Sequence, residues 1–251
     1  MRIKKNIAVV IQGPLDDRTY EAIDQYQDFG EVIVSTWKDQ DISVLDKSIG
    51  KYKLVESTYP TNLNEYHNHG YRYFIAQTTL AGAEASSMPY VLKTRSDELY
   101  PNLNSMLANF DLYPSKVHTT DNGFWKHIPF SFSNHLFIES KAILVQACKY
   151  LVEASKGKTD QDIKDVLMTP EQSFGYYLMK ARGYDIIREI EWKGVFRQNV
   201  FITPCSLLPN HLHSGGSYYN TIPFKRYPNY PFGRPDGHDI KQLYQSHTEI
   251  Q

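Results

Sequence analysis

Two adjacent acidic residues, Asp97 and Glu98, are the part of the sequence best suited to chemistry. They follow the apolar segment 89–94, which is typical of a buried strand, so they would lie on the turn that leaves it. Hard divalent cations such as Mg²⁺ prefer carboxylate oxygens, and a bound cation stabilises charge on phosphate oxygens. We therefore expect Asp97 and Glu98 to bind Mn²⁺ or Mg²⁺, with Asp97 serving the catalytic step. The alternatives are an acidic helix cap and salt bridges to Arg95.

Three histidines extend this hypothesis. His211 and His213 are two residues apart, and in an extended segment that spacing puts both side chains on one face. Either ring could complete a metal site with Asp97, although both could equally lie in a surface loop. His135 lies in the strand-like segment 133–138 and could face an acceptor sugar, or it could be a buried core histidine.

Acidic residues in the second half of the chain are candidates for a general base. Glu171 follows a Thr-Pro pair that is typical of a helix start, so it would lie in the first helical turn. From there it could take a proton from an acceptor hydroxyl. Acids also favour that turn because of the helix dipole, so the position alone does not assign the role. Asp121 and Glu139 are further candidates, and we place Asp121 with His135 near the acceptor.

The elements that would position these residues follow a regular order. Segments rich in β-branched residues predict strands, and segments with helical spacing alternate with them. The predicted strands of the first half are 6–11, 31–36, 52–56 and 89–94, and the predicted helices are 17–29, 39–49 and 64–86. Short connections in a β-α-β-α-β order predict a doubly wound α/β fold, with a mostly parallel Rossmann-type sheet flanked by helices.

Polar residues follow the predicted strands at the edge where parallel sheets bind ligands. We expect these residues to bind a nucleotide and its phosphates: Gln12, Gly13, Pro14, Thr36, Trp37, Asp41, Lys93, Arg95 and Ser96. The sequence has no G-x-x-x-x-G-K-[ST] phosphate loop, no G-x-G-x-x-G after the first strand and no G-x-S-x-G. A metal ion or side chains must therefore balance the negative charge of a phosphate group.

The second half of the chain contains further predicted elements and an irregular tail. The predicted helices are 103–110, 140–154 and 169–182, and the predicted strands are 116–119, 133–138 and 186–190. The tail, 204–237, is rich in Pro, Tyr and Phe, which predicts irregular structure. This tail could be a lid over a sugar, a peripheral contact with a membrane, or a wrap over the sheet edge.

Composition places the chain among ordinary globular proteins. Hydrophobic residues are 41% and charged residues 22% of the 251 residues, and the net charge of -1 argues against a general nucleic-acid binder. Two cysteines, Cys148 and Cys205, predict reduced thiols, and no apolar stretch reaches the roughly 20 residues of a membrane helix. We expect one cytoplasmic domain over residues 1–251, with nucleotide binding in about 1–100 and acceptor binding in about 101–251.

Three motifs together resemble a known family. I-A-V-V-I-Q-G-P at 7–14, V-I-V-S-T-W at 32–37 and V-L-K-T-R-S-D-E at 91–98, in this order, resemble the WavE-type lipopolysaccharide-synthesis proteins. The resemblance covers roughly residues 5–140 and includes S-N-H-L-F-I at 133–138. It implies a GT-A-like glycosyltransferase fold, a nucleotide-sugar donor, a divalent metal at Asp97 and a sugar acceptor.

The predicted function is thus a metal-dependent glycosyltransferase. It would move a sugar from a nucleoside-diphosphate sugar to a hydroxyl of a glycan or lipopolysaccharide-type acceptor. One alternative is a sugar nucleotidyltransferase, which would need a Gly-rich, Arg-containing loop after the first strand, and Q-G-P-L-D-D at 12–17 is a poor version of that loop. Another alternative is a noncatalytic glycan- or nucleotide-binding module in which the acidic residues are structural.

Overall fold

Apolar and β-branched runs form the strands of the first half, as the sequence predicts. A computed structural model describes residues 6–16, 18–28, 30–60, 70–121, 130–158, 170–185, 189–204, 208 and 212–213. The first elements are β1 (Ile7–Gln12), α1 (Thr19–Tyr26), β2 (Glu31–Trp37), the 3₁₀ helix η1 (Ile42–Ser48), β3 (Lys53–Ser57), α2 (Gly70–Ala85), β4 (Tyr90–Arg95) and β5 (Glu98–Leu99). Every residue of β1 is buried, as expected of a strand with helices on both faces.

The second half of the chain also contains both helices and strands. Its elements are α3 (Asn104–Leu112), β6 (Val117–Thr120), β7 (Phe137–Ser140), α4 (Lys141–Glu153), the π-helical turn η3 (Ala154–Lys158), α6 (Pro170–Ala181), α7 (Glu189–Asn199), β8 (Val200–Thr203) and β9 (Leu212–His213). Helix α4 begins where the sequence predicts, because the hydroxyl of Ser140 accepts a hydrogen bond from the backbone N–H of Ile143. Helix α6 begins with Pro170, whose missing N–H costs nothing at that position.

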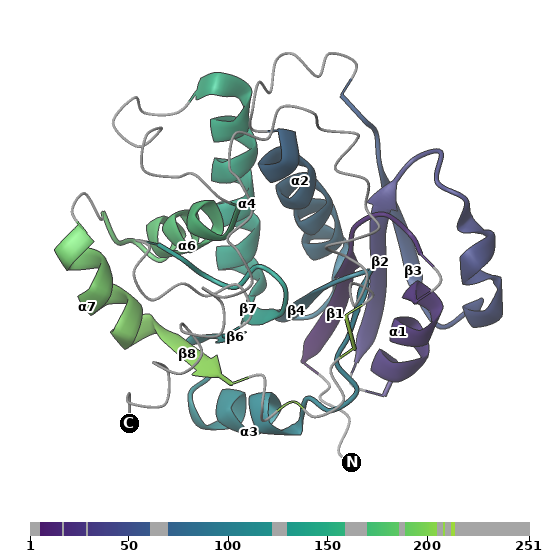
Figure 1. Cartoon of the computed structure of the whole chain (residues 1–251), viewed down its shortest axis with the longest axis horizontal. Coiled ribbons are helices and arrows are strands. Elements are labelled where there is room, and N and C mark those ends of the chain that lie inside the picture. Colours follow the sequence, from purple (N-terminus) through teal and green to yellow (C-terminus); the bar gives the residue numbers. More distant parts are fainter. Residues whose placement is uncertain are drawn as a thin grey trace, which may run out of the picture. The chain divides into compact units, whose positions relative to one another are not determined.

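The large sheet has seven strands in the order β3-β2-β1-β4-β7-β6-β8 (Figure 1). Strand β1 pairs with β2 and β4 in parallel, and β2 pairs with β3 in parallel. Strand β7 runs antiparallel to both of its neighbours, β4 and β6, and β8 is parallel to β6. The chain therefore winds outward from β1 to β3 and then returns to the other side of β1 with β4. Open α/β sheets bind ligands at such a reversal of strand order.

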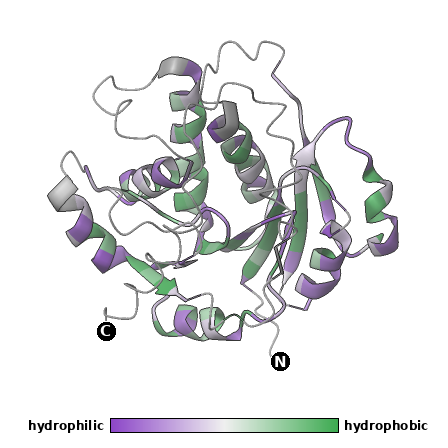
Figure 2. Ribbon diagram, in the orientation of Figure 1, coloured by the Kyte–Doolittle hydropathy of each residue, from purple (hydrophilic) through white to green (hydrophobic). Residues whose placement is uncertain are grey.

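Each face of this sheet has its own apolar core. Val10 and Ile33 belong to one core, which also contains residues of α2, α4 and α6. Val9 and Val34 belong to the other core, with residues of α1 and α3. Neighbouring strand residues thus alternate between the two cores, as the pleat of a strand requires. Hydrophobic residues accordingly dominate the central strands in Figure 2.

Most predicted elements agree with the structure, and three need correction. The four strands of the first half each lie within one residue of their predicted bounds, whereas the predicted helix 39–49 is the 3₁₀ helix η1. The predicted strand 186–190 is wrong for its described part, because residues 189–190 begin α7. Trp192 and Phe196 lie one turn apart in α7 and are both buried, which favours a helix over a strand. Only the end of the predicted strand 133–138 forms part of β7.

The predicted fold class is confirmed: an α/β fold with a mostly parallel sheet flanked by helices. All described residues belong to one compact unit, Met1–Ser214. Most of the predicted irregular tail and Cys205 lie outside the described residues, so a single domain over the whole chain stays a prediction. In the described part, Cys148 is a buried free thiol, and we find no helix with the length and apolar character needed to span a membrane.

Candidate active site at the carboxyl edge of the sheet

The turns that follow β1 and β4 are joined by backbone hydrogen bonds. Gln12, the last residue of β1, pairs with Arg95 on one side and with Ser35 on the other. Beyond the strands, the N–H of Ser96 donates to the carbonyl of Gln12 at 2.9 Å, and the N–H of Gly13 donates to the carbonyl of Ser35 at 3.2 Å. The predicted residues Gln12, Gly13, Arg95 and Ser96 are therefore brought together at the reversal of strand order.

Gly13 is required by this junction. Its φ of +133° is unfavourable for residues with a side chain, and a Cβ atom at this position would lie 2.6 Å from Oγ of Ser96. The Ser96 hydroxyl donates a hydrogen bond to the carbonyl of Pro14 at 2.5 Å. The glycine thus lets the β1 turn approach the β4 turn, and Ser96 fixes the two turns together.

Arg95 holds the first residue of the acidic pair. Its Nε donates to Oδ1 of Asp97 at 2.8 Å, and its Nη2 donates to Oδ2 at 2.6 Å. Both side chains are only 13% exposed, so this is a largely buried, two-point ion pair. The predicted alternative for Asp97, a salt bridge to Arg95, is what the structure shows.

Glu98 is fully buried and binds two other side chains. The hydroxyl of Tyr100 donates to Oε2 at 2.9 Å, and Nδ1 of His135 lies 2.5 Å from Oε1. Nε of Arg95 lies 3.9 Å from the same Oε1 atom. Glu98 is thus the centre of a buried polar cluster, and it brings His135 to the rim from a segment that is distant in sequence.

The backbone of the second half returns to this cluster. Strand β9 pairs antiparallel with β5, and the register places His213 opposite Glu98. The backbone of His213 therefore lies beside the acidic pair, as predicted. The side chain of His213 and the whole of His211 lie outside the described residues.

The described side chains do not fit a divalent cation as they are arranged. Both oxygens of Asp97 accept hydrogen bonds from Arg95, and both oxygens of Glu98 have partners. Over the described parts of the chain, no three His, Cys, Asp or Glu side chains gather in a geometry that could hold a metal ion. Binding of Mn²⁺ or Mg²⁺ stays a prediction, because two of its four predicted ligands lie outside the described side chains.

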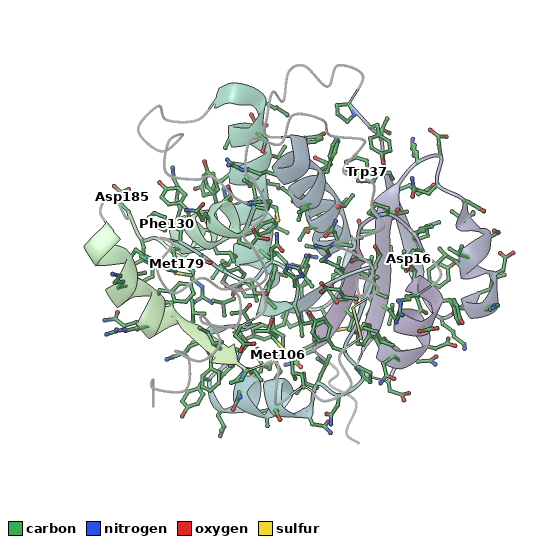
Figure 3. The ribbon with its side chains drawn as sticks, viewed as in Figure 1. Asp16, Trp37, Met106, Phe130, Met179 and Asp185 are labelled. Carbon is green, nitrogen blue, oxygen red and sulfur yellow. The ribbon has the colours of Figure 1, made fainter. Side chains whose placement is uncertain are left out.

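Asp16 is a further acidic residue of this rim that the sequence analysis did not single out (Figure 3). Burial is the main cause that raises the pKa of Asp16, and the negative charge of Asp97 raises it further. Its Oδ1 accepts a hydrogen bond from the N–H of Arg18 at 2.8 Å, and its own N–H donates to the hydroxyl of Thr19 at 3.0 Å. The Gly-Pro turn that precedes Asp16 was the available signal that this segment bends back over the strand ends.

The residues predicted to bind a nucleoside after β2 are differently placed. Trp37 lies at the end of β2 (Figure 3) and is only 2% exposed, because Tyr59 stacks on it with ring centroids 4.5 Å apart. Thr36 is also buried, and its hydroxyl has no hydrogen-bond partner in the described structure. Asp41 is exposed and caps η1 by accepting a hydrogen bond from the N–H of Ser43. Hydrogen bonds from the side chain and then the backbone of Ser43 lower the pKa of Asp41. Tyr59 therefore presents the aromatic surface that the sequence assigned to Trp37.

Lys93 lies inside the sheet rather than on its rim. Its side chain is fully buried, and its ammonium donates to the carbonyl of Asn134 and lies 5.9 Å from the ring centroid of Phe137. Burial, together with the nearby charge of Arg95, lowers the pKa of Lys93 to about 7. Lys93 therefore contacts the chain before β7, and its side chain is not exposed at the rim.

The predicted acidic residues of the second half do not all reach the cluster. Glu171 is in the first turn of α6 as predicted and is partly exposed. The start of α6 packs closely on the chain before β7, since a Cβ at Gly175 would lie 2.1 Å from the carbonyl oxygen of Phe130. Asp121 follows β6 and is partly exposed. Glu139 is bound by Arg182 at 2.8 Å and is therefore part of an internal ion pair.

Comparisons with known proteins give structural similarity only. No family model and no curated protein matches the sequence, so the resemblance to WavE-type proteins stays a prediction. The apo form of the glycosyltransferase GlyE from Streptococcus pneumoniae TIGR4 is similar over 99% of this chain and 61% of its own, at 12% identity and a TM-score of 0.49. Residues 1–349 of TarS from S. aureus are similar over 70% of this chain and 55% of that one, at 15% identity and a TM-score of 0.42.

This chain therefore spans between 55% and 61% of the length of these two solved structures. At such identities and TM-scores the likeness does not define an activity.

Proposed function

We propose that this protein is a glycosyltransferase that moves a sugar from a nucleoside-diphosphate sugar to a hydroxyl of a glycan or lipopolysaccharide-type acceptor. The observation that carries the proposal is the cluster of Arg95, Asp97, Glu98 and His135 at the reversal of strand order between β1 and β4. Nucleotides bind at this position in open parallel sheets. The residues there can balance the negative charge of phosphate groups and transfer protons.

The roles that we assign follow from position. Gln12, Gly13 and Pro14 form the turn after β1, which would receive the nucleoside, and Arg95 and Ser96 would lie beside the phosphates. Tyr59, 42% exposed and backed by Trp37, is the aromatic side chain best placed to contact a base. Lys93 is buried beneath the rim and would not contact the donor directly.

Charge balance sets a condition on donor binding. Three carboxylates, those of Asp16, Asp97 and Glu98, lie near the rim, and Arg95 is the cation bound to two of them. A diphosphate would add further negative charge to this region. Donor binding must therefore be accompanied by a cation or by a rearrangement of the Arg95–Asp97 pair, and the predicted dependence on Mn²⁺ or Mg²⁺ would meet the first condition.

The test is a panel of nucleoside-diphosphate sugars measured by thermal shift and by hydrolysis without acceptor, each with Mn²⁺, with Mg²⁺ and with a chelator. We expect one nucleotide to raise Tm, and we expect Arg95→Met to weaken its binding at least about tenfold because a phosphate contact is lost. Lys149→Met is the control, because Lys149 lies on the exposed side of α4 in an ion pair with Glu84.

Two other outcomes would refute the proposal. Release of pyrophosphate from a sugar phosphate and a nucleoside triphosphate would identify a sugar nucleotidyltransferase. Binding of a nucleotide sugar or glycan without any turnover would identify a binding module. The metal prediction fails separately if donor binding and turnover are the same with the chelator as with Mn²⁺.

A further inference from the structure

We propose that His135 is the general base of the transfer reaction and that Glu98 is its positioning residue. This inference rests on the proposed function. It differs from the expectation that Glu171 is the base and that Glu98 is a metal ligand. Four features of the described structure support it: the position of His135 at the edge of the sheet, the contact with Glu98, the anchored backbone around His135, and the placement of Glu171.

The chain before β7 brings His135 to the edge of the sheet where a ligand would bind. Gln12 pairs with Arg95 across β1 and β4. Strand β7 pairs antiparallel with β4 up to the pair Lys93 and Phe137. His135 lies two residues before this last pair, in the bend that leads into β7. Nδ1 of His135 and Nε of Arg95 both approach Oε1 of Glu98, at 2.5 and 3.9 Å, so His135 lies near Arg95 at the reversal of strand order, where a donor would bind.

The contact with Glu98 fixes the ring of His135. The Glu98 carboxylate lies 2.5 Å from Nδ1, is fully buried, and is itself held by the Tyr100 hydroxyl at 2.9 Å. A carboxylate at Nδ1 favours the tautomer that has its proton on Nδ1, which leaves Nε2 as the basic atom. The His135 side chain is 14% exposed, so its ring reaches the surface of the rim while its partner does not.

The backbone around His135 is anchored on both sides. The hydroxyl of Thr119 lies within hydrogen-bonding distance of the carbonyls of Ser133 and Leu136, at 3.1 and 3.2 Å. The buried ammonium of Lys93 donates to the carbonyl of Asn134. Two buried donor groups, the Thr119 hydroxyl and the Lys93 ammonium, thus lie within hydrogen-bonding distance of three of the four carbonyls from 133 to 136, with the single Thr119 proton shared between two of them. A catalytic side chain needs such support, because small displacements of the reacting atoms cost rate.

Among the described residues, we find no side chain that holds Glu171 as Glu98 holds His135. It is partly exposed in the first turn of α6, where a carboxylate is also stabilised by the helix dipole. The ring of His135, by contrast, is held at Nδ1 by the buried carboxylate of Glu98.

The proposed step is a single displacement. The acceptor hydroxyl gives its proton to Nε2 of His135 while its oxygen forms a bond to the anomeric carbon of the donor sugar. The bond from that carbon to the diphosphate oxygen breaks, and its electron pair leaves with the nucleoside diphosphate. The imidazolium is stabilised by Glu98 and later releases its proton to water. This reaction inverts the anomeric carbon.

A test that needs no substrate is the tautomer of His135, measured by nitrogen NMR on protein labelled with ¹⁵N-histidine at alkaline pH. His135→Gln identifies the signal. We expect the Nδ1-protonated tautomer in the wild type and in the control Glu84→Gln. In Glu98→Gln the new amide can donate to Nδ1, so we expect the proton to move to Nε2. An unchanged tautomer in Glu98→Gln would overturn the positioning role of Glu98.

The base role is tested by kinetics with the donor and acceptor found in the panel. We expect His135→Gln to lower kcat by about 10² to 10⁴ with little change in the KM of the donor, and Glu98→Gln to lower kcat by at least about tenfold. Circular dichroism and Tm check that both variants are folded. A His135→Gln protein with normal kcat, a larger loss in Glu171→Gln, or retention at the anomeric carbon would each overturn the base role.

The two proposals fail in different ways. If the wild type transfers no sugar, the proposed function fails and the base role fails with it, while the NMR signal still decides whether Glu98 orients the ring. If transfer occurs but depends on Glu171, only this inference fails.

Discussion

The guanidinium of Arg95 binds both carboxylate oxygens of Asp97, with Nε 2.8 Å from Oδ1 and Nη2 2.6 Å from Oδ2. Sequence patterns alone favour a metal ligand at Asp97. The geometry shows instead that Asp97 forms an ion pair with Arg95, two positions earlier in the chain. Any ligand that uses Asp97 must compete with Arg95.

We expect the Arg95–Asp97 pair to contribute measurably to stability. Both side chains are largely buried, so removing either partner leaves a charge with poor solvation. Asp97→Asn and Arg95→Met should each lower the free energy of unfolding by about 1–3 kcal/mol, and the double variant should lose less than the sum. Urea unfolding of the four proteins measures this coupling. Additive losses would show that the pair contributes no net interaction energy.

Lys93 should make stability depend on pH. Burial lowers the pKa of Lys93 from 10.5 to about 7, so between these values the unfolded chain binds a proton that the native protein has released. The free energy of unfolding of the wild type should therefore rise as the pH increases from about 7 toward 10.

Lys93→Met removes this dependence. We expect the variant to gain stability relative to the wild type at neutral pH and to lose that advantage as the pH rises, because the wild-type lysine is then neutral as well. Urea unfolding across the pH range is the measurement, with Lys149→Met as an exposed control. Parallel pH profiles for the wild type and Lys93→Met would contradict the prediction.

Gly13→Ala should disrupt the rim. The alanine would adopt an unfavourable positive φ, and its Cβ would meet Oγ of Ser96 at 2.6 Å. We expect a loss of about 1–3 kcal/mol in stability and weaker nucleotide binding. Gly50→Ala is a matched control, because Gly50 also has a positive φ, of +83°, but nothing lies within 4 Å of its Cβ position. Equal losses in the two variants would show that the contact with Ser96 has no effect.

The Glu139–Arg182 pair should be more costly to break than a surface pair. Arg182 is 9% and Glu139 2% exposed, and their atoms lie 2.8 Å apart. Burial raises the pKa of Glu139, and the charge of Arg182 opposes that rise. Arg182→Met should therefore lose about 3–5 kcal/mol at neutral pH.

The stability of Arg182→Met should depend on pH in a defined direction. With Arg182 gone, the pKa of Glu139 rises further, so the native state holds a proton that the unfolded chain loses. The stability of Arg182→Met should therefore fall as the pH rises above about 4.5. Thermal unfolding from acid to neutral pH checks it, and a variant least stable in acid would contradict it.

Much of the first half could be predicted from the sequence because its signals are local. Continuous β-branched runs such as 6–11 and the helices between them specify a parallel sheet without further information. The helix predicted at 140–154, which Ser140 caps, and the helix start at Pro170 are likewise specified by local sequence and agree with the structure.

The rest depends on contacts between distant residues. The order of the strands, the antiparallel direction of β7 and the pairing of Glu98 with His213 arise only when segments far apart in the sequence meet. The buried position of Lys93 was missed because a lysine near a strand end is usually exposed. Asp16 was missed because its proximity to Asp97 depends on the pairing of β1 with β4.

The strand order also has a consequence for synthesis of the protein. Strand β1 meets β2 early, but its other neighbour is β4, and β4 in turn pairs with β7, whose last residue is Ser140. A nascent chain from which β4 has not yet emerged keeps one edge of its apolar central strand unpaired and open to other chains. Slow synthesis before β4 has left the ribosome should therefore favour aggregation, and slow synthesis after β7 has left it should be far less harmful.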